Sequence, residues 1–198
     1  MSASRRYAGQ SVPPVPHTPA TPDLSPDEER QVVNRVIEGN GESLAVLYAH
    51  HGRVAYSAAL RLLRDEQDAE DVIQEMFVRL PVTLAGYDAA RGTLGPWLRR
   101  VAVRLALMRL RGNRRRREVG ALEVATLLAR DDSPLDRMTI EDALRRLTDD
   151  QRTVFLLKEV EGYEQREIAV LLGISTSASE VRLYRARVAL RALLGSSR

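Results

Sequence analysis

Apolar residues return at helical spacing along most of this 198-residue chain. They recur every three or four positions from Ser43 onward, which is the period of one face of an α-helix. Examples are Leu44, Leu47, Val54, Ala58 and Leu62. No stretch of the sequence keeps the alternation of a half-buried strand. The sequence therefore predicts an all-α fold, and its 44% of hydrophobic residues can build real cores.

Changes in composition divide the chain into four expected parts. Residues 1–24 are rich in Pro, Ser and Thr and lack apolar periodicity, so we expect a disordered tail. Residues 25–117 and 133–198 carry helical patterns and predict two small helical domains. The segment 118–132 between them is expected to be a linker.

Helix-end signals predict where the helices begin and end. Ser25 and Glu28 form a predicted capping box, Pro26 suits the first helical position, and Gly39 to Gly41 stop this helix. Further helices are expected at about 67–84, from Pro96 toward Arg111, from Ser133 as a cap with Pro134, from a capping box of Thr148 with Gln151, over 164–172 before Gly173, and over 175–194.

The last two of these helices predict a helix-turn-helix. They are joined by a turn that contains Gly173, the second helix is basic, and Ala169 would let the two cross closely. The basic residues expected along one side of the second helix are Arg182, Arg185, Arg187 and Arg191. The apolar residues expected to pack the domain are Val181, Leu183, Val188, Leu190 and Leu194. Such a helix suits a DNA major groove, and an ordinary helical hairpin is the alternative.

Ten arginines and no acidic residue lie between Ala89 and Arg117. Trp97 stands among them and Tyr87 just before them, and basic residues interleaved with aromatic ones suit unpaired nucleic acid, whose bases stack on the rings. An ordinary solvated face is the alternative. The nearly exclusive use of arginine, with Lys158 as the single lysine, favours phosphate and base contacts but fits a GC-rich genome equally well.

The stretch "DAEDVIQEMF", residues 68–77, places four carboxylates in a chain whose formal net charge is +3. On a helical wheel the apolar residues of this region fall within one arc. They are Ala69, Val72, Ile73, Met76, Phe77 and Leu80. The opposite side holds Asp71, Gln74, Glu75 and Val78. A valine amid carboxylates favours a protein-binding surface, with a solvated acidic face as the alternative.

Several classes of protein are not expected. The chain has no cysteine, which excludes disulfides, zinc ribbons and thiol catalysis. Without a Glu-x-x-His pair, a nucleophile elbow or a Walker loop, and with His50 and His51 adjacent and so unable to face one metal, no enzyme, metal or cofactor is expected. No apolar run approaches a membrane span or a signal peptide, so we expect a cytoplasmic protein.

In order, the chain carries "DAEDVIQEMF", "GPWLRRVAVRLALMRLR" and "LTDDQRTVFLLKEVEGYEQREIAVLLGIS" followed by "RLYRAR". These blocks resemble the polymerase-docking segment of region 2, the promoter-melting and minus-10-reading helix, and region 4 of the extracytoplasmic-function (ECF) group of bacterial sigma-70 factors. The resemblance covers about residues 28–195. It implies a region 2-like bundle, a region 4-like helix-turn-helix domain, and a sigma factor that directs core RNA polymerase to promoters and helps to open the minus-10 region.

The resemblance also implies which residues make these contacts. Facing the clamp helices of the largest polymerase subunit would be Asp71, Gln74, Glu75 and Val78. On the minus-10 DNA would be Tyr87, Trp97, Arg100, Arg104 and Arg111, with the loop of about 84–94 receiving a flipped base. On the minus-35 DNA would be Ser177, Arg182, Arg185 and Arg187. An anti-sigma factor, the usual family arrangement, is a candidate further partner.

Two stretches depart from the family pattern. The minus-10 helix usually reads I-A-x-N-x-x-x-D, which puts the expected minus-10 preference in question because this chain has Val101, Ala102, Arg104 and Met108. The recognition helix commonly opens G-T-V-K-S-R, whereas this chain reads S-A-S-E-V-R over residues 177–182. Glu180 is either a specificity change or, with Ser177, a capping box, and the sequence favours the box.

Two other interpretations compete with a sigma factor. One is a helix-turn-helix regulator that binds duplex DNA without polymerase. The other is a helical protein-interaction adaptor with no role on DNA.

Overall fold

The computed structural model describes residues 24–120 and 139–195, and all the regular structure in these two ranges is helical. The predicted all-α fold is confirmed. The chain divides into two compact units at Asn113, and each is described by itself. Most of the predicted tail and linker lie outside the described residues, while residues 118–120 of the predicted linker belong to a helix.

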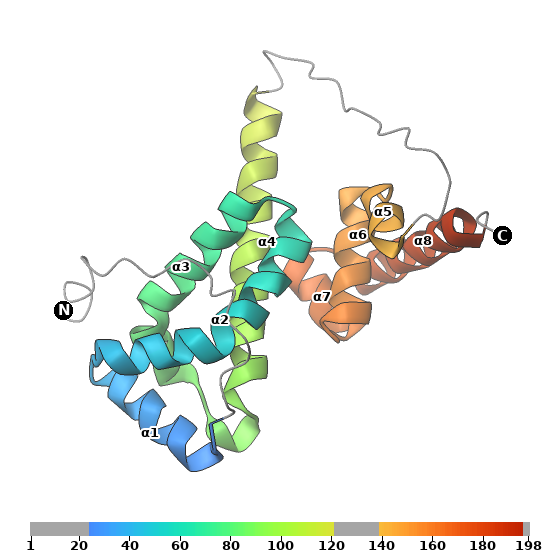
Figure 1. Cartoon of the computed structure of the whole chain (residues 1–198). Helices are drawn as coiled ribbons and strands as arrows, with labels where there is room; N and C mark the ends of the chain where they lie inside the picture. The colour runs from blue at the N-terminus through green and yellow to red at the C-terminus, as the bar shows by residue number, and fades with distance from the viewer. Residues whose placement is uncertain (1–23, 121–138, 196–198) are drawn as a thin grey trace. The chain divides into compact units, whose positions relative to one another are not determined.

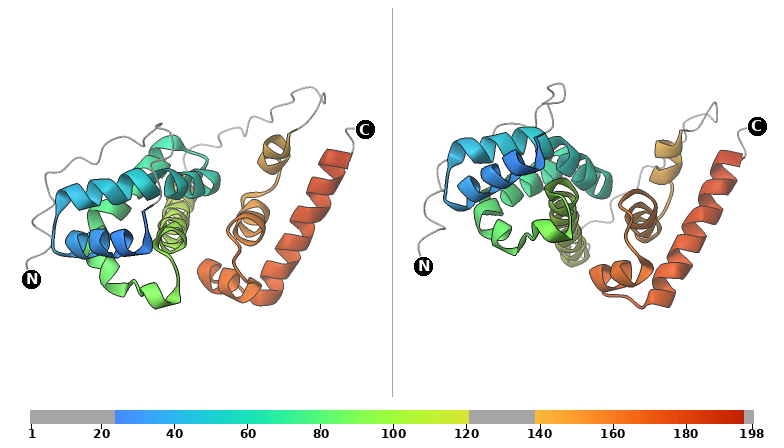
Figure 2. Two further views of the ribbon diagram at one scale, coloured as in Figure 1. Left: turned by 60° about the horizontal axis from the view of Figure 1, so that its bottom comes forward. Right: turned by 90° about the horizontal axis from the view of Figure 1, so that it is seen from below.

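The first unit is a helical bundle. Its elements are α1 (Pro26–Ile37), α2 (Gly41–Leu63), α3 (Glu66–Thr83), the 3-10 turns η1 (Leu84–Gly86) and η2 (Ala89–Arg91), and α4 (Leu94–Gly120) as far as Asn113. The helices α1, α2 and α3 contact one another in pairs (Figures 1 and 2). The predicted capping box of Ser25 and Glu28 is confirmed, with Pro26 as the first residue of α1.

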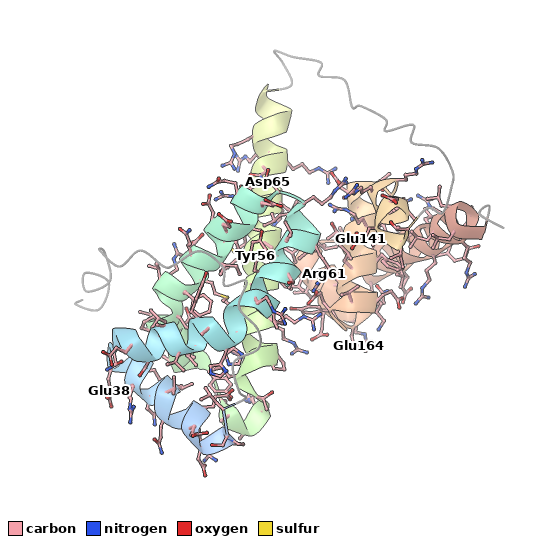
Figure 3. All side chains as sticks on the ribbon, viewed as in Figure 1. Glu38, Tyr56, Arg61, Asp65, Glu141 and Glu164 are labelled. Atoms are coloured by element: carbon pink, nitrogen blue, oxygen red, sulfur yellow. The ribbon has the colours of Figure 1, made fainter. Side chains whose placement is uncertain are left out.

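Helix α3 begins as its sequence dictates. Asp65, labelled in Figure 3, caps the helix by accepting a hydrogen bond from the Asp68 backbone N–H. The six apolar residues of the predicted arc are all buried, as predicted. Among them Phe77 packs edge-on against Tyr48 of α2, with 4.8 Å between ring centroids. Because this arc faces the core, the residues on the opposite side of α3 must face outward.

Helix α4 completes this core and starts earlier than Pro96. Its buried side consists of Leu94, Leu98, Ala102, Val103, Ala106 and Leu107. Because these residues lie three and four apart, the opposite side of α4 must face outward. Val54, by contrast, continues the apolar spacing of α2 but is exposed, so its predicted place in the apolar face is wrong.

The second unit is built along its last helix. Its elements are α5 (Ile140–Arg145), α6 (Asp149–Phe155), the π-helical turn η3 (Leu156–Val160), α7 (Gln165–Leu172) and α8 (Thr176–Gly195). The helices α5, α6 and α7 each contact α8 (Figure 2). Buried between α5 and α8 is a small cluster of Ala143, Leu147, Ala186 and Leu190.

Helix ends in the second unit follow the sequence in part. The capping box of Thr148 with Gln151 is confirmed. Gly173 ends α7 in the left-handed conformation, with φ of 67°, where glycine is favoured. The predicted start at Ser133 lies outside the described residues, in which α5 begins after a capping box of Thr139 with Asp142.

Candidate protein and nucleic-acid interfaces

A strip of exposed side chains runs along the outer side of α3. Gln74 is exposed, and Val78 and Val82, one turn apart, are 43% and 60% exposed. Glu75 also reaches this side and forms an ion pair with Arg79 at 3.0 Å. The sequence prediction missed Val82, although it lies four residues after Val78 and so had to share its face.

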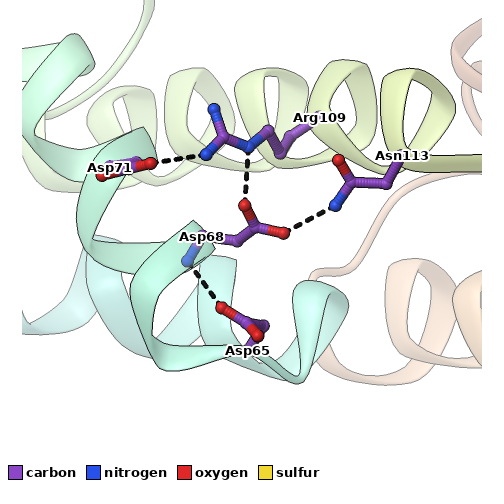
Figure 4. A network of polar contacts seen from close by, with 5 residues as sticks. All are labelled: Asp65, Asp68, Asp71, Arg109 and Asn113. Carbon is purple, nitrogen blue, oxygen red and sulfur yellow. Dashed lines mark hydrogen bonds and ion pairs between the residues drawn. The ribbon is translucent and has the colours of Figure 1, made fainter. Parts of the chain in front are cut away.

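Two other acidic residues of α3, Asp68 and Asp71, bind to α4 (Figure 4). The guanidinium of Arg109 donates from Nε to Asp68 at 2.7 Å and from Nη2 to Asp71 at 2.5 Å. Asn113, one turn further along α4, donates to the second oxygen of Asp68 at 2.6 Å. The side chain of Asp68 is only 21% exposed, whereas that of Asp71 is 41% exposed. Asp71 therefore has a partner within the domain and still reaches the surface.

These pairs change the electrostatics expected for α3. Hydrogen bonds from Arg109 to Asp68 and Asp71 raise the pKa of the guanidinium, although its partial burial acts in the opposite direction. One arginine then faces two carboxylates, and Arg79 faces a third. The outer strip of α3 is therefore less acidic and more apolar than the sequence predicted.

Along α4 runs a strip of the opposite kind, which we call the arginine strip: Arg100, Arg104, Met108 and Arg111. Its residues are three and four apart, so they share one face of the helix, and all four are exposed. Met108, with 59% of its surface exposed, is the one apolar member. The three arginines are among the predicted minus-10 residues, which the helix thus brings together.

Two aromatic residues meet at the start of α4. The rings of Tyr87 and Trp97 lie 5.4 Å apart at 56°, and both side chains are partly buried. The Tyr87 hydroxyl donates to the Gly92 carbonyl oxygen at 3.0 Å, which closes the loop between α3 and α4. Burial raises the pKa of Tyr87, helped by the nearby Glu29 carboxylate. The two predicted aromatic residues therefore lie side by side, and Tyr87 is held there by its hydrogen bond within the loop.

Glu29 connects this loop to α1 and α2. Its carboxylate accepts a hydrogen bond from the Leu94 backbone N–H at 3.4 Å and lies 3.7 Å from His51 Nε2. The side chain of His51 is partly buried. Among the residues that the structure describes, no group of three histidine or acidic side chains could hold a metal ion.

In the second unit, the start of α8 differs from the prediction. The predicted capping box of Ser177 with Glu180 is wrong, because the helix begins at Thr176 and the Ser175 hydroxyl accepts from the Ala178 backbone N–H at 3.1 Å. Ser177 and Glu180 are both exposed. Ser179 is fully buried and donates to Gln165 of α7 at 2.6 Å, so it joins the two helices of the helix-turn-helix.

Two of the three predicted minus-35 arginines pair with acidic residues of their own domain. Arg182 forms an ion pair with Asp150 of α6 at 2.9 Å, and Arg187 donates to Glu159 of η3 at 2.5 Å. Arg185 is exposed. Arg182 and Arg187 therefore help to hold α8 in place.

The outer face of α8 is more apolar than predicted. Val181 and Val188 are exposed, so their predicted packing role is wrong, and Tyr184, which the sequence analysis did not single out, is 70% exposed. The buried side runs instead through Ser179, Leu183, Ala186 and Leu190. These four residues follow one another at intervals of three or four and so share one face of the helix, whereas Val181 and Val188 lie off that face.

A helical bundle with an arginine strip, together with a helix-turn-helix, is typical of a nucleic-acid-binding protein. Comparison with known families agrees. The model of sigma-70 region 2 matches residues 47–116, and the model of sigma-70 region 4 matches residues 137–190.

Known proteins resemble the chain over most of its length. The RNA polymerase sigma factor NccH of Alcaligenes xylosoxydans xylosoxydans is 30% identical over 87% of this chain and 97% of its own. The ECF RNA polymerase sigma factor SigL of Mycobacterium tuberculosis is 33% identical over 76% of this chain and 88% of its own. A solved structure of CnrH in complex with the cytosolic domain of CnrY is 30% identical, covers 86% of this chain and 99% of that chain, and has a TM-score of 0.50.

The chain therefore belongs to the sigma-70 family of bacterial RNA polymerase sigma factors and, within it, to the ECF group. Within the two described ranges, the longest and most apolar helices still fall short of what a membrane span requires.

Proposed function

We propose that this sigma factor docks on core RNA polymerase through α3, holds the opened minus-10 DNA on α4 and the preceding loop, and binds the minus-35 element through α8. It would do this in the cytoplasm, without catalysing a reaction. The observation that carries the proposal is the contrast between two helices of one domain. The outer strip of α3 is acidic and apolar, whereas α4 presents arginines beside an aromatic pair.

The α3 strip suits a protein partner with a basic surface, such as the clamp helices of the polymerase. Val78 and Val82 would supply apolar contact area, and Gln74 and Glu75 would give the polar contacts that fix orientation. Asp71 would contribute from the edge, because it already accepts a hydrogen bond from Arg109.

The arginine strip suits a DNA strand. Its three guanidinium groups would contact successive phosphates, while the rings of Tyr87 and Trp97 would stack on unpaired bases. Flipping a base from the duplex costs a few kcal/mol. Stacking of a base on an aromatic ring stabilises the opened state by about 1–3 kcal/mol per base. The strands can therefore separate without hydrolysis of a nucleotide.

On the minus-35 element, α8 would enter the major groove with Ser177, Tyr184 and Arg185 outward. Arg182 and Arg187 would act mainly by fixing the angle of α8, because each has an acidic partner in the domain. Regulation by an anti-sigma factor is part of the proposal. The solved structure of CnrH with the cytosolic domain of CnrY supports it, since a similar protein binds a second protein there.

The docking claim is tested by capture of purified core polymerase on the immobilised chain. The variant is Glu75→Arg with Val78→Asp, which reverses the charge and removes the apolar contact of the α3 strip. The control is Glu38→Arg, an exposed carboxylate at the end of α1 (Figure 3). We expect the double variant to lose most binding and the control to bind like the wild type. Equal binding of all three proteins would refute the assignment of α3.

A further inference from the structure

We propose that Met108 acts as an apolar wedge that contacts unstacked promoter bases and helps to separate the strands. This inference rests on the proposed function and adds a strand-opening residue to it. The roles proposed above for the arginines and for the aromatic pair do not require a strand-opening role for Met108.

Met108 is not part of the buried side of α4. The buried side of α4 is filled by other residues, among them Ala102, Val103 and Ala106, which are all fully buried. Met108 lies on the opposite face and is 59% exposed. Its thioether is therefore available for contact with whatever partner the neighbouring arginines bind.

The neighbours of Met108 identify the partner as a polyanion. Arg104 lies one turn before it and Arg111 one turn after it, both exposed on the same face. No acidic residue occurs between Ala89 and Arg117, so a basic protein surface would be repelled here. Phosphates can bind the two guanidinium groups and leave the thioether between them facing the bases.

The chemistry of methionine suits this contact. Its side chain is flexible and polarisable, so it adapts to base faces of different shape. Methionine is one of the apolar residues that DNA-bending proteins insert between base steps, which partly unstacks them. An arginine or a glutamate at the same position could bind a phosphate or repel it but could not fill the gap between two bases.

The spacing along α4 supports a second base contact at this point. Trp97 and Met108 are eleven residues apart, which is close to three full turns, so they share one face of the helix. At 1.5 Å per residue the separation is about 16 Å, or roughly five base steps of 3.4 Å. The aromatic pair and Met108 would therefore contact the two ends of a short opened segment, with Arg100 and Arg104 along the strand between them.

The test uses the whole chain bound to core polymerase on a promoter found by sequencing its own transcripts. Each promoter is prepared as a full duplex and as a template already mismatched across the minus-10 region. The variants are Met108→Ala and the conservative Met108→Leu. The control is Val54→Ala, which truncates another exposed apolar residue of the same unit. Permanganate reactivity of unpaired thymines measures strand opening, and capture on the polymerase measures docking.

We expect Met108→Ala to lower opening of the duplex roughly five- to tenfold, with normal docking, and the mismatched template to restore it. Met108→Leu should keep most of the opening, and Val54→Ala all of it. An equal loss on both templates, no loss, or a loss of docking would each overturn the wedge. Failure of the wild-type protein on both templates would instead refute the proposed function.

Discussion

Replacing Arg109 by methionine tests the network that joins α3 to α4. The change keeps most of the aliphatic stem and removes the guanidinium, so Asp68 loses one hydrogen-bond donor but keeps its contact with Asn113, and Asp71 loses the Arg109 donor. A buried carboxylate that loses a partner costs about 1–3 kcal/mol, and exposed pairs contribute less than about 1 kcal/mol. Since Asp68 is 21% exposed and Asp71 41%, we expect a loss of about 2 kcal/mol in the free energy of unfolding.

Urea unfolding of the whole chain measures this loss. Trp97 is the single tryptophan and lies in the first unit, so its fluorescence follows that unit alone. A double-mutant cycle with Asp68→Asn should give a coupling free energy of about 1–2 kcal/mol, and a cycle with Asp71→Asn a smaller one, below about 1 kcal/mol. No coupling to Asp68, or a larger coupling to Asp71, would refute the interpretation that Asp68 is the structural member of the pair.

Two further predictions concern the helix ends and α8. Hydrogen bonds from Ser25 lower the pKa of Glu28 below its ordinary value of 4.5, so the stability that this carboxylate adds is present above pH 4.5 and is lost as the pH falls through the lowered pKa. An NMR titration of Glu28 should give this lowered value, and an unshifted one would contradict the cap. For α8, Arg185→Ala should weaken minus-35 binding in a DNA-binding assay at unchanged stability. Arg182→Ala should instead lower the free energy of unfolding, by less than about 1 kcal/mol, because it breaks the pair with Asp150. A loss of stability with Arg185→Ala and none with Arg182→Ala would contradict this assignment.

The parts of the fold that depend on local spacing could be predicted from the sequence. The buried arc of α3 and the stop at Gly173 are such cases, because a 3.6-residue period and a left-handed glycine act within a few residues. The start of α8 was predicted wrongly. Three serines and a threonine occur within five residues there, and each could cap a helix, so the sequence does not choose between Ser175 and Ser177.

The parts that depend on contacts between helices could not be predicted. Arg109 lies 41 residues from Asp68 and 38 from Asp71, and no local pattern relates them. In the same way, the pairing of Arg182 with Asp150 depends on how α6 packs on α8. Val181 and Val188 look like core residues by type, but the packing partners of α8 cover the side that runs through Leu183 and Ala186.

Transcription by core RNA polymerase on genomic DNA, with and without the purified chain, tests most directly whether this protein selects promoters. We predict that adding the chain produces new transcripts whose start sites lie at a fixed distance from one shared pair of minus-35 and minus-10 sequences. The same set of transcripts with and without the chain would contradict the central claim that this protein selects promoters for the polymerase.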